Sequence, residues 1–361
     1  MMRRLLPGLL ASVLMLAMGC KEADGSSGGT AGVALYAYDS ATSSVFVWTD
    51  LGTLYDSTAS AAAPSKTITS SVFSSKIASL AWGGLCFDRQ NGYLYLVSDT
   101  GNIVRVSNIR SQSGTVASSD VVSFSLASTG RLSNSTFGQA SLDIQSGNLY
   151  ITESGSSGTQ IWVVSNASSQ AQSATISLTP LAVNGDTGGT GVAAGSGSVY
   201  AFMLSGDTVG SLTTYSGPRL RKGTASGFTD ANTIIGGSTL LGAHGSLALD
   251  TGNGYLFVAR HNVDAGATTA PVQVFTTGMF GQAHDQAPVA TLGSAVDQPD
   301  LRVIAHAGTK DWLAGLRGNG ATAYGTIHLW KSPMGGTAAK AIAVSPATSL
   351  FKGVAVDGNA S

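Results

Sequence analysis

The side chains that could take part in chemistry are not clustered in this sequence. Each occurs alone, at one of two positions that recur with a repeated pattern of strands. Acidic side chains could hold a cation together with backbone carbonyls, and imidazoles could ligate a transition metal. Guanidinium, ammonium, amide and indole groups could bind a polar ligand. The residues that we expect to converge on one ligand-binding face are Asp39, Trp82, Asp99, Gln139, Glu153, His244, His261, Asp300, Arg317 and Lys352.

Several of these side chains have a second interpretation. Asp39 and Asp99 stand in good turn sequences, because an Asp carboxylate readily binds nearby backbone amides. Glu153, which precedes Ser-Gly, could simply be solvated, and Trp82 could plug a channel instead of stacking on a ligand.

The five His residues all lie between positions 244 and 328, which raises the question of a metal site. Only His244 and His261 fall on the expected ligand face of one repeat, whereas a transition-metal site needs three or four ligands that converge. We therefore predict no cofactor. A Ca²⁺ ion held by the acidic members of the set is the option that stays open.

Other functional signatures are missing from the sequence. It has no Gly-x-Ser-x-Gly elbow between a strand and a helix, no Walker loop and no Cys-x-x-Cys-His motif. Cys86 stands in mid-strand as a small apolar residue without a His partner. The net charge of −1 gives no electrostatic basis for nucleic-acid binding.

The elements that position these residues come from a repeat: an aliphatic strand, a Gly turn and an aromatic-rich strand. Such a period predicts an all-β fold, a six-bladed β-propeller. The last residues of the six expected inner strands are separated by 50 to 57 residues. They are Asp88, Gln145, Gly195, Asp250, His306 and Asp357.

Each end of the domain lacks strands that the other end can supply. The strand at 353–357 has no partner strands after it, and the strands at 33–38 and 45–48 lack a first strand. Pairing 353–357 with 33–38 closes the ring and leaves no open edge. The expected outer strands are 102–106 and 121–126, 160–164 and 174–178, 272–276 and 289–292, and 326–330 and 341–345.

In a propeller, the starts of the inner strands and the loops between second and third strands lie on the same face. This is why the ten residues above should surround one funnel. Asp88, Asp250 and Asp357, at the opposite ends of inner strands, are expected to form turns beside Gly.

The segment 245–259, followed by Val272-Gln273-Val274-Phe275, resembles the NHL-repeat six-bladed propellers and, more loosely, the SMP-30/gluconolactonase-like group. The second resemblance implies a metal at the funnel, held by an acidic residue of the first inner strand and by Asn and Asp of later blades. Here the segment 351–357 offers Lys352 but no Glu. A metal-dependent lactonase or esterase is therefore the alternative and not the first choice.

The N-terminus has the features of an export signal: basic residues at 1–4, an apolar segment at 5–18 and the sequence Leu16-Ala17-Met18-Gly19-Cys20. This end resembles a bacterial lipobox, in which Cys20 carries the lipid. We expect a signal peptide at 1–19, a flexible tether at 20–32 and the propeller at 33–361. An ordinary secretory signal cut near Gly19 is the alternative.

These observations predict a membrane-anchored lipoprotein of the cell envelope. Lys21 after the lipidated Cys indicates the outer membrane. Its propeller would be a non-catalytic module that binds an unknown protein, small molecule or carbohydrate. A purely structural envelope protein is a third class.

Overall fold

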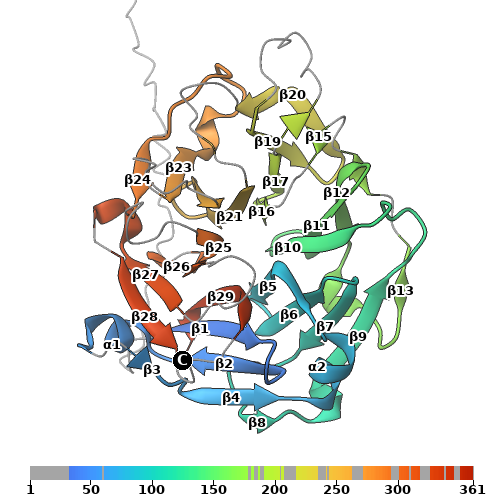
Figure 1. Ribbon diagram of the computed structural model, residues 1–361, viewed down its shortest axis with the longest axis vertical. Helices are drawn as coiled ribbons and strands as arrows, with labels where there is room; N and C mark the ends of the chain where they lie inside the picture. The colour runs from blue at the N-terminus through green and yellow to red at the C-terminus, as the bar shows by residue number, and fades with distance from the viewer. Residues whose placement is uncertain are drawn as a thin grey trace, which may run out of the picture. The chain divides into compact units, whose positions relative to one another are not determined.

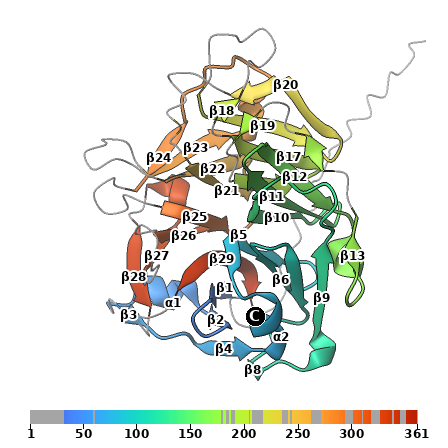
Figure 2. The same ribbon diagram turned by 45° about the vertical axis from the view of Figure 1, so that its right-hand side comes forward.

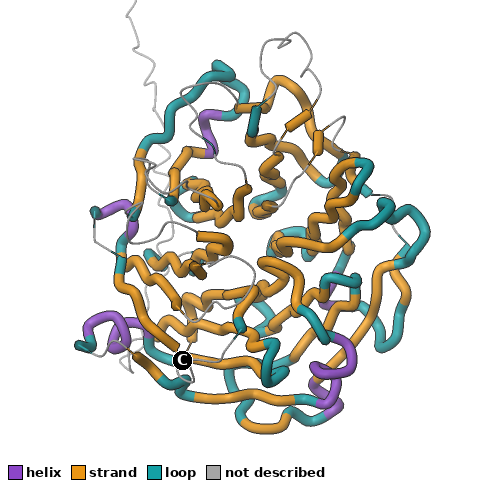
Figure 3. Tube along the Cα trace, viewed as in Figure 1, coloured by secondary structure: helices purple, strands orange, loops and turns teal. Residues whose placement is uncertain are grey.

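The computed structural model describes residues 32–58, 61–177, 180–182, 186–187, 191–203, 205–206, 217–234, 241, 244–261, 271–293, 301–308, 310–317, 326–336, 339–344 and 350–360. Within these residues, six mainly antiparallel sheets surround a common centre as the blades of a β-propeller (Figure 1). The blades can also be followed in a turned view (Figure 2) and in the Cα trace (Figure 3). The predicted all-β, six-bladed architecture is confirmed.

Each blade has one inner strand beside the channel and three strands farther out. From inside outward, the first blade is β29 (Phe351–Ala360), β1 (Gly32–Asp39), β2 (Ser44–Trp48) and β4 (Lys66–Thr69). The second is β5 (Leu80–Asp88), β6 (Tyr93–Ser98), β7 (Asn102–Val106) and β9 (Val121–Leu126). The third is β10 (Thr136–Asp143), β11 (Asn148–Gly155), β12 (Gly158–Val164) and β14 (Leu181–Ala182).

The other three blades repeat this order. The fourth is β16 (Gly191–Gly195), β17 (Ser198–Met203), β19 (Arg219–Thr224) and β20 (Gly227–Ile234). The fifth is β21 (His244–Asp250), β22 (Tyr255–His261), β23 (Val272–Thr276) and β24 (Ala290–Leu292). The sixth is β25 (Leu301–His306), β26 (Trp312–Arg317), β27 (Thr326–Lys331) and β28 (Lys340–Val344).

The predicted closure of the ring is confirmed. β29 pairs antiparallel with β1, with Leu35 opposite Val356 and Asp39 opposite Phe351. The inner strand of the first blade thus comes from the end of the domain and the other three strands from its beginning. β29 covers the edge of β1, which would otherwise be a template for aggregation.

Three two-residue strands join outer edges of neighbouring blades. β3 (Ala61–Ala62), β8 (Gly114–Thr115) and β13 (Thr175–Ile176) pair in parallel with β28, β4 and β9, each an outer strand of the preceding blade. The assignment of 174–178 as the outer strand of blade three is therefore wrong, because this segment belongs to the edge of blade two and β14 takes its place. Strand propensity indicates an extended segment but not the edge that it joins.

The remaining elements are short and lie outside the six inner strands. β15 (Asp186–Thr187) and β18 (Ser205–Gly206) pair with each other. Helix α1 (Leu51–Asp56) begins where the Asp50 side chain accepts the amide of Thr53, and α2 (Ser71–Lys76) has Ser70 in the same role. The 3₁₀ turns are η1 (Ser118–Asp120), η2 (Ala167–Ser169), η4 (Thr277–Met279) and η5 (Pro333–Gly335).

The turn after each inner strand depends on the residue that ends the strand. The Asp88 carboxylate accepts the amides of residues 90 and 91, and Asp250 accepts those of 252 and 253. Gly92 and Gly254 end these turns at φ of +67° and +70°, which favours Gly. In blade three the equivalent residue is Asp143, whose carboxylate accepts the amide of Gln145, so the assignment of Gln145 to this position is wrong by two residues.

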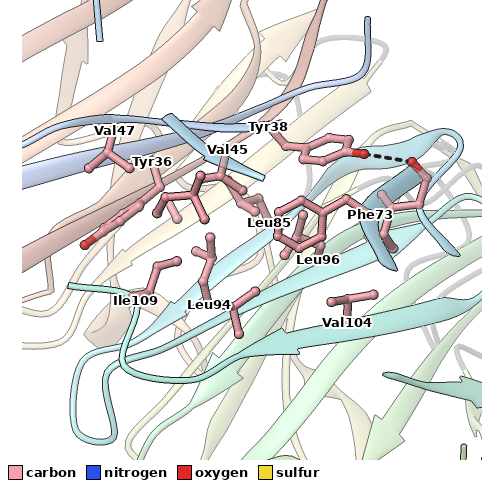
Figure 4. Close-up of a cluster of buried hydrophobic side chains, with 14 of the residues drawn as sticks. Tyr36, Tyr38, Val45, Val47, Phe73, Leu85, Leu94, Leu96, Val104 and Ile109 are labelled. Atoms are coloured by element: carbon pink, nitrogen blue, oxygen red, sulfur yellow. Dashed lines mark hydrogen bonds between the residues drawn. The ribbon is translucent and has the colours of Figure 1, made fainter. Parts of the chain in front are cut away.

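The core lies between adjacent blades. In the cluster between blades one and two, Tyr36, Val45 and Val47 face Leu94 and Leu96 across the interface (Figure 4). The Tyr38 hydroxyl in the same cluster donates to the Ile77 carbonyl at 2.9 Å. Burial of each large apolar side chain contributes about 1.5–3 kcal/mol, so these interfaces fix the blades around the channel. In the part of the chain that is described, no helix has the length and apolar composition needed to cross a membrane.

Candidate functional site

A cavity of about 290 Å³ occupies the centre of the propeller. Its wall consists of residues from all six inner strands and from the turns that follow them. Apolar side chains in the wall include Leu142, Leu249 and Ala305, and polar atoms contribute a comparable share of the wall. The charged wall residues are Arg89 and Asp143, which lie where the inner strands β5 and β10 end. The charged groups of the cavity therefore lie at one mouth.

At the end of the cavity where the inner strands begin, Gln139 bridges three blades. Its side-chain nitrogen donates to the Leu247 carbonyl at 2.6 Å. Its side-chain oxygen accepts the amides of Leu247 at 2.9 Å and Val192 at 3.1 Å. Gly83 leaves room for this side chain, because a Cβ there would lie 3.0 Å from the Gln139 Cγ. Every polar atom of this buried amide thus has a structural partner.

Trp82 connects the other three blades near the same end. The Arg302 guanidinium lies 5.1 Å and the Lys352 ammonium 5.5 Å from the centre of its ring. These two cations come from β25 and β29, the inner strands of blades six and one. Lys352 also donates to the Ser79 hydroxyl at 2.8 Å. Gln139 and Trp82 together link all six inner strands at this end.

The opposite end of the cavity, at the turns, carries a guanidinium. Arg89 follows the last residue of β5, and its Nη2 donates to Thr251 Oγ1 of blade five at 3.4 Å. Its Nη1 lies against Gly308 of blade six, so closely that a Cβ on Gly308 would overlap it. Blade five stands opposite blade two in a six-membered ring. The Arg89 side chain therefore reaches across the mouth of the cavity.

His306 is the second polar group at this mouth. Its side chain is only 1% exposed and stacks on Phe257 at 5.3 Å between ring centres. Nδ1 accepts the amide of Gly308 at 3.0 Å, the role that Asp has in other blades, which leaves the proton of the neutral ring on Nε2. Nε2 lies 3.9 Å from an Asp250 oxygen, too far for a hydrogen bond, and has no partner among the described residues. Burial lowers the pKa of His306, while Asp250 acts in the opposite direction.

The residues of the predicted ligand-binding face lie in different surroundings. Asp39 is buried, and its carboxylate accepts Thr42 Oγ1 at 2.6 Å and the amide of Leu350 at 2.7 Å, so the turn interpretation describes its contacts. Asp99 is half-buried, and its carbonyl accepts the amide of Phe137. Gln139, Trp82 and Lys352 come together at the channel end described above.

Glu153 is completely buried and has four donors. Its carboxylate accepts Arg131 Nε at 3.2 Å, Gln160 Nε2 at 2.5 Å and Trp162 Nε1 at 2.6 Å, and also the Ser135 hydroxyl. Burial raises the pKa of Glu153, but the hydrogen bonds outweigh it and the pKa is lowered. These contacts hold the third blade together.

The remaining members of the predicted set are only partly described. His244 and His261 are opposite each other in the pairing of β21 and β22, and Arg317 is opposite Leu301, but their side chains lie outside the described part. Asp300 and Cys20 also lie outside the described residues. The ligand-binding role of the ten residues stays a prediction.

Two further observations concern chemistry at the cavity. Cys86 lies in the wall as a free, buried thiol, and burial raises its pKa well above the usual range, which disfavours the nucleophilic thiolate. Among the residues that the structure describes, no group of three or more His, Cys, Asp or Glu side chains is arranged to hold a metal ion.

Sequence reasoning missed Arg89, Thr251 and His306 as site residues. For Arg89 and Thr251, a signal was available in the type of residue that directly follows the end of each inner strand. These are Arg89, Ile144, Ser196, Thr251, Ala307 and Gly358. Arg89 is the one charged residue among them, a difference that turn chemistry does not explain.

No family model and no curated protein matches this chain. Solved structures share the fold. A chain of a nidogen/laminin complex is 13% identical, with a TM-score of 0.54 over 90% of this chain and 98% of that one. TolB from Acinetobacter baumannii is 11% identical, with a TM-score of 0.49 over 91% and 67%. A gluconolactonase from Xanthomonas campestris is 13% identical, with a TM-score of 0.42 over 75% and 78%. At these identities the likeness concerns the fold alone.

Proposed function

We propose that this chain is a non-catalytic binding module of the bacterial cell envelope and holds a small ligand in its central cavity. The observation that carries this proposal is the cavity of about 290 Å³ to which all six inner strands contribute. Ligand sites commonly measure roughly 300–1,000 Å³, so the cavity suits a compact molecule. Its wall combines apolar side chains with a small number of polar groups that could orient a ligand.

The scaffold supports binding because the wall is already fixed without a ligand. Gln139 and Trp82 connect the inner strands, and the pairing of β29 with β1 closes the ring. A site built on rigid strands loses little conformational entropy when the ligand enters.

We further propose that lipidated Cys20 anchors the domain to the outer membrane. Support comes from the basic residues, the apolar segment and the Gly19-Cys20 pair at the N-terminus. Metabolic labelling with palmitate should mark the full chain and be lost in Cys20→Ala. Labelling that survives this substitution would contradict the anchor.

The binding proposal is tested by a thermal-shift screen of small organic acids, sugars and neutral metabolites against the exported chain. A compound that raises the Tm is then measured with Ala305→Phe, which adds a ring to the cavity wall, and with the milder Ala305→Val. Asp99→Asn, in the loop after β6 and outside the cavity wall, is the matched control. We expect Ala305→Phe to abolish binding and Asp99→Asn to preserve it.

The opposite result, with loss in Asp99→Asn and full binding in folded Ala305→Phe, would move the site to the predicted funnel face. If no compound binds and a pull-down from native membranes captures no protein, the chain is a structural envelope protein instead. Turnover of lactones or aryl esters that depends on Ca²⁺, Mg²⁺, Mn²⁺ or Zn²⁺ would overturn the non-catalytic assignment in favour of a hydrolase.

A further inference from the structure

We infer that the mouth of the central cavity, at Arg89 and His306, is an anion site that takes the carboxylate of a small organic acid. The inference rests on the proposed binding function and names the chemistry of its ligand. It places the charged end of the ligand at the turns that follow the inner strands. This is the opposite end of the channel from the face that the repeat pattern indicated.

The first support is the electrostatic state of Arg89. Among the described residues, no carboxylate lies within ion-pair distance of its guanidinium, and its side-chain hydrogen bond is the long contact of 3.4 Å with Thr251. The nearby carboxylates are committed elsewhere: Asp88, Asp143 and Asp250 accept backbone amides, and Asp357 is paired with Arg110. A guanidinium in this position keeps its capacity to bind a planar oxyanion in a bidentate manner.

The second support is His306. A buried N–H without a partner costs about 1–3 kcal/mol, which a ligand acceptor would recover. The Nε2 atom of His306 is such a group, because it is buried without a hydrogen-bond partner among the described residues, and His306 is one of the residues that line the cavity. Stacking on Phe257 and the bond from Gly308 to Nδ1 hold the ring in one orientation. The donor therefore exists before a ligand arrives.

The balance of charge favours a carboxylate over a phosphate dianion. The mouth supplies one full positive charge from Arg89 and one neutral imidazole donor, while the Asp250 carboxylate lies 3.9 Å from Nε2 and Asp143 belongs to the cavity wall. A second negative charge on the ligand would be repelled by Asp143 and Asp250 without a second cation to offset it. A monoanion matches this site better.

The body of the ligand follows from the rest of the wall. Leu142, Leu249 and Ala305 line the cavity behind the mouth, and the side-chain oxygen of Gln139 at its far end already accepts two backbone amides. An acid with a compact apolar body would bury that body in the channel and leave its carboxylate at Arg89.

The test uses benzoate as probe and benzamide as its neutral match, measured on the exported chain by ligand-observed NMR. Arg89→Gln removes the charge and should weaken benzoate binding about tenfold or more, since a charge-assisted hydrogen bond contributes about 1.5–3 kcal/mol. Arg89→Lys should restore part of the affinity. His306→Asn keeps an acceptor for the Gly308 amide but removes Nε2, and it should weaken binding as well. Benzamide and inorganic phosphate should bind less well than benzoate.

Arg302→Gln is the matched control, because it makes the same change of charge at the other end of the channel. It should leave benzoate binding unchanged. Equal affinity in Arg89→Gln and the natural chain, loss only in Arg302→Gln, or no binding of benzoate at all would each overturn the anion site. In those cases a neutral compound that raises the Tm and no longer binds in Ala305→Phe would still support the proposed function. Failure of the anion site can therefore be distinguished from failure of the binding function.

Discussion

Arg110 and Asp357 form a bidentate ion pair that joins the second blade to the strand closing the ring. Nε and Nη2 of Arg110 donate to the two carboxylate oxygens at 2.6 and 3.0 Å, across 247 residues of sequence. Asp357 is fully buried, and Arg110 also donates to the Arg89 carbonyl at 3.0 Å. The pair therefore connects the closure of the ring with the residue at the mouth of the cavity.

The first prediction concerns this pair. Arg110→Ala leaves the Asp357 carboxylate buried without its cation and should lower the free energy of unfolding by about 2–3 kcal/mol. Arg110→Lys, which keeps the charge but loses the bidentate geometry, should have an intermediate effect. Urea denaturation measures both. Lys331→Ala is the control, because the Lys331–Asp56 pair is exposed with its atoms 3.9 Å apart, and its loss should cost less than about 1 kcal/mol. Equal effects of the two Ala variants would contradict the role of the buried pair.

The second prediction concerns closure. A chain that lacks residues 351–361 loses the inner strand of blade one and exposes both faces of the gap. We expect it to aggregate and to lose its cooperative thermal transition, because Phe351, Val354 and Val356 all belong to the buried cluster between blades one and six. Differential scanning calorimetry and light scattering measure this. A chain that lacks only Ser361 should melt as the full chain does, and an unchanged Tm of the longer truncation would show that the ring does not need β29.

Local pattern was sufficient to predict much of this fold. The strands at 102–106, 121–126 and 272–276 were predicted with the bounds that they have, because alternating apolar residues and Asp-to-Gly turns are both short-range features. The closure was predictable because the missing strands at the two ends are complementary. The position of Asp143 was missed because Gln145, two residues on, is also polar and lies in the same turn.

The features that were missed depend on contacts between distant segments. Residues 174–178 have strand composition, but only the folded ring brings Thr175 beside Ser125 of the preceding blade. Arg89 is adjacent to a turn in the sequence, and nothing in that pattern encodes its reach across the channel to Thr251. The burial of Glu153 likewise follows from donors on two other segments, the loop with Arg131 and the strand β12, and not from its own Ser-Gly context.

The third prediction concerns Gln139, the amide that crosses the channel. Gln139→Leu has a similar volume but leaves the amides of Val192 and Leu247 without their acceptor in a buried site. Each unsatisfied donor costs about 1–3 kcal/mol, so we expect a loss of about 2–4 kcal/mol in urea denaturation. Gln90→Leu makes the same chemical change at an exposed position and should alter stability by less than about 0.5 kcal/mol. If the two variants are equally stable, the crossing amide does not hold the blades.

The fourth prediction concerns pH and Glu153. Its pKa in the fold is lowered from the ordinary 4.5, because four donors stabilise the carboxylate against the effect of burial. A group whose folded pKa is lowered adds stability above its unfolded pKa and loses it as the pH falls from there through the folded value. The free energy of unfolding should therefore decrease with falling pH below about 4.5.

Glu153→Gln tests the origin of this dependence. The variant should be less stable at neutral pH by about 2–3 kcal/mol, since its amide nitrogen faces donors that need an acceptor. Below pH 4.5 its unfolding free energy should change less steeply than that of the natural chain, because the residue no longer takes up a proton. Asp56→Asn, at a side chain that is 68% exposed, is the control and should leave the slope unchanged. A slope that is as steep in Glu153→Gln as in the natural chain would assign the acid sensitivity to other carboxylates, such as the buried Asp residues at the turns.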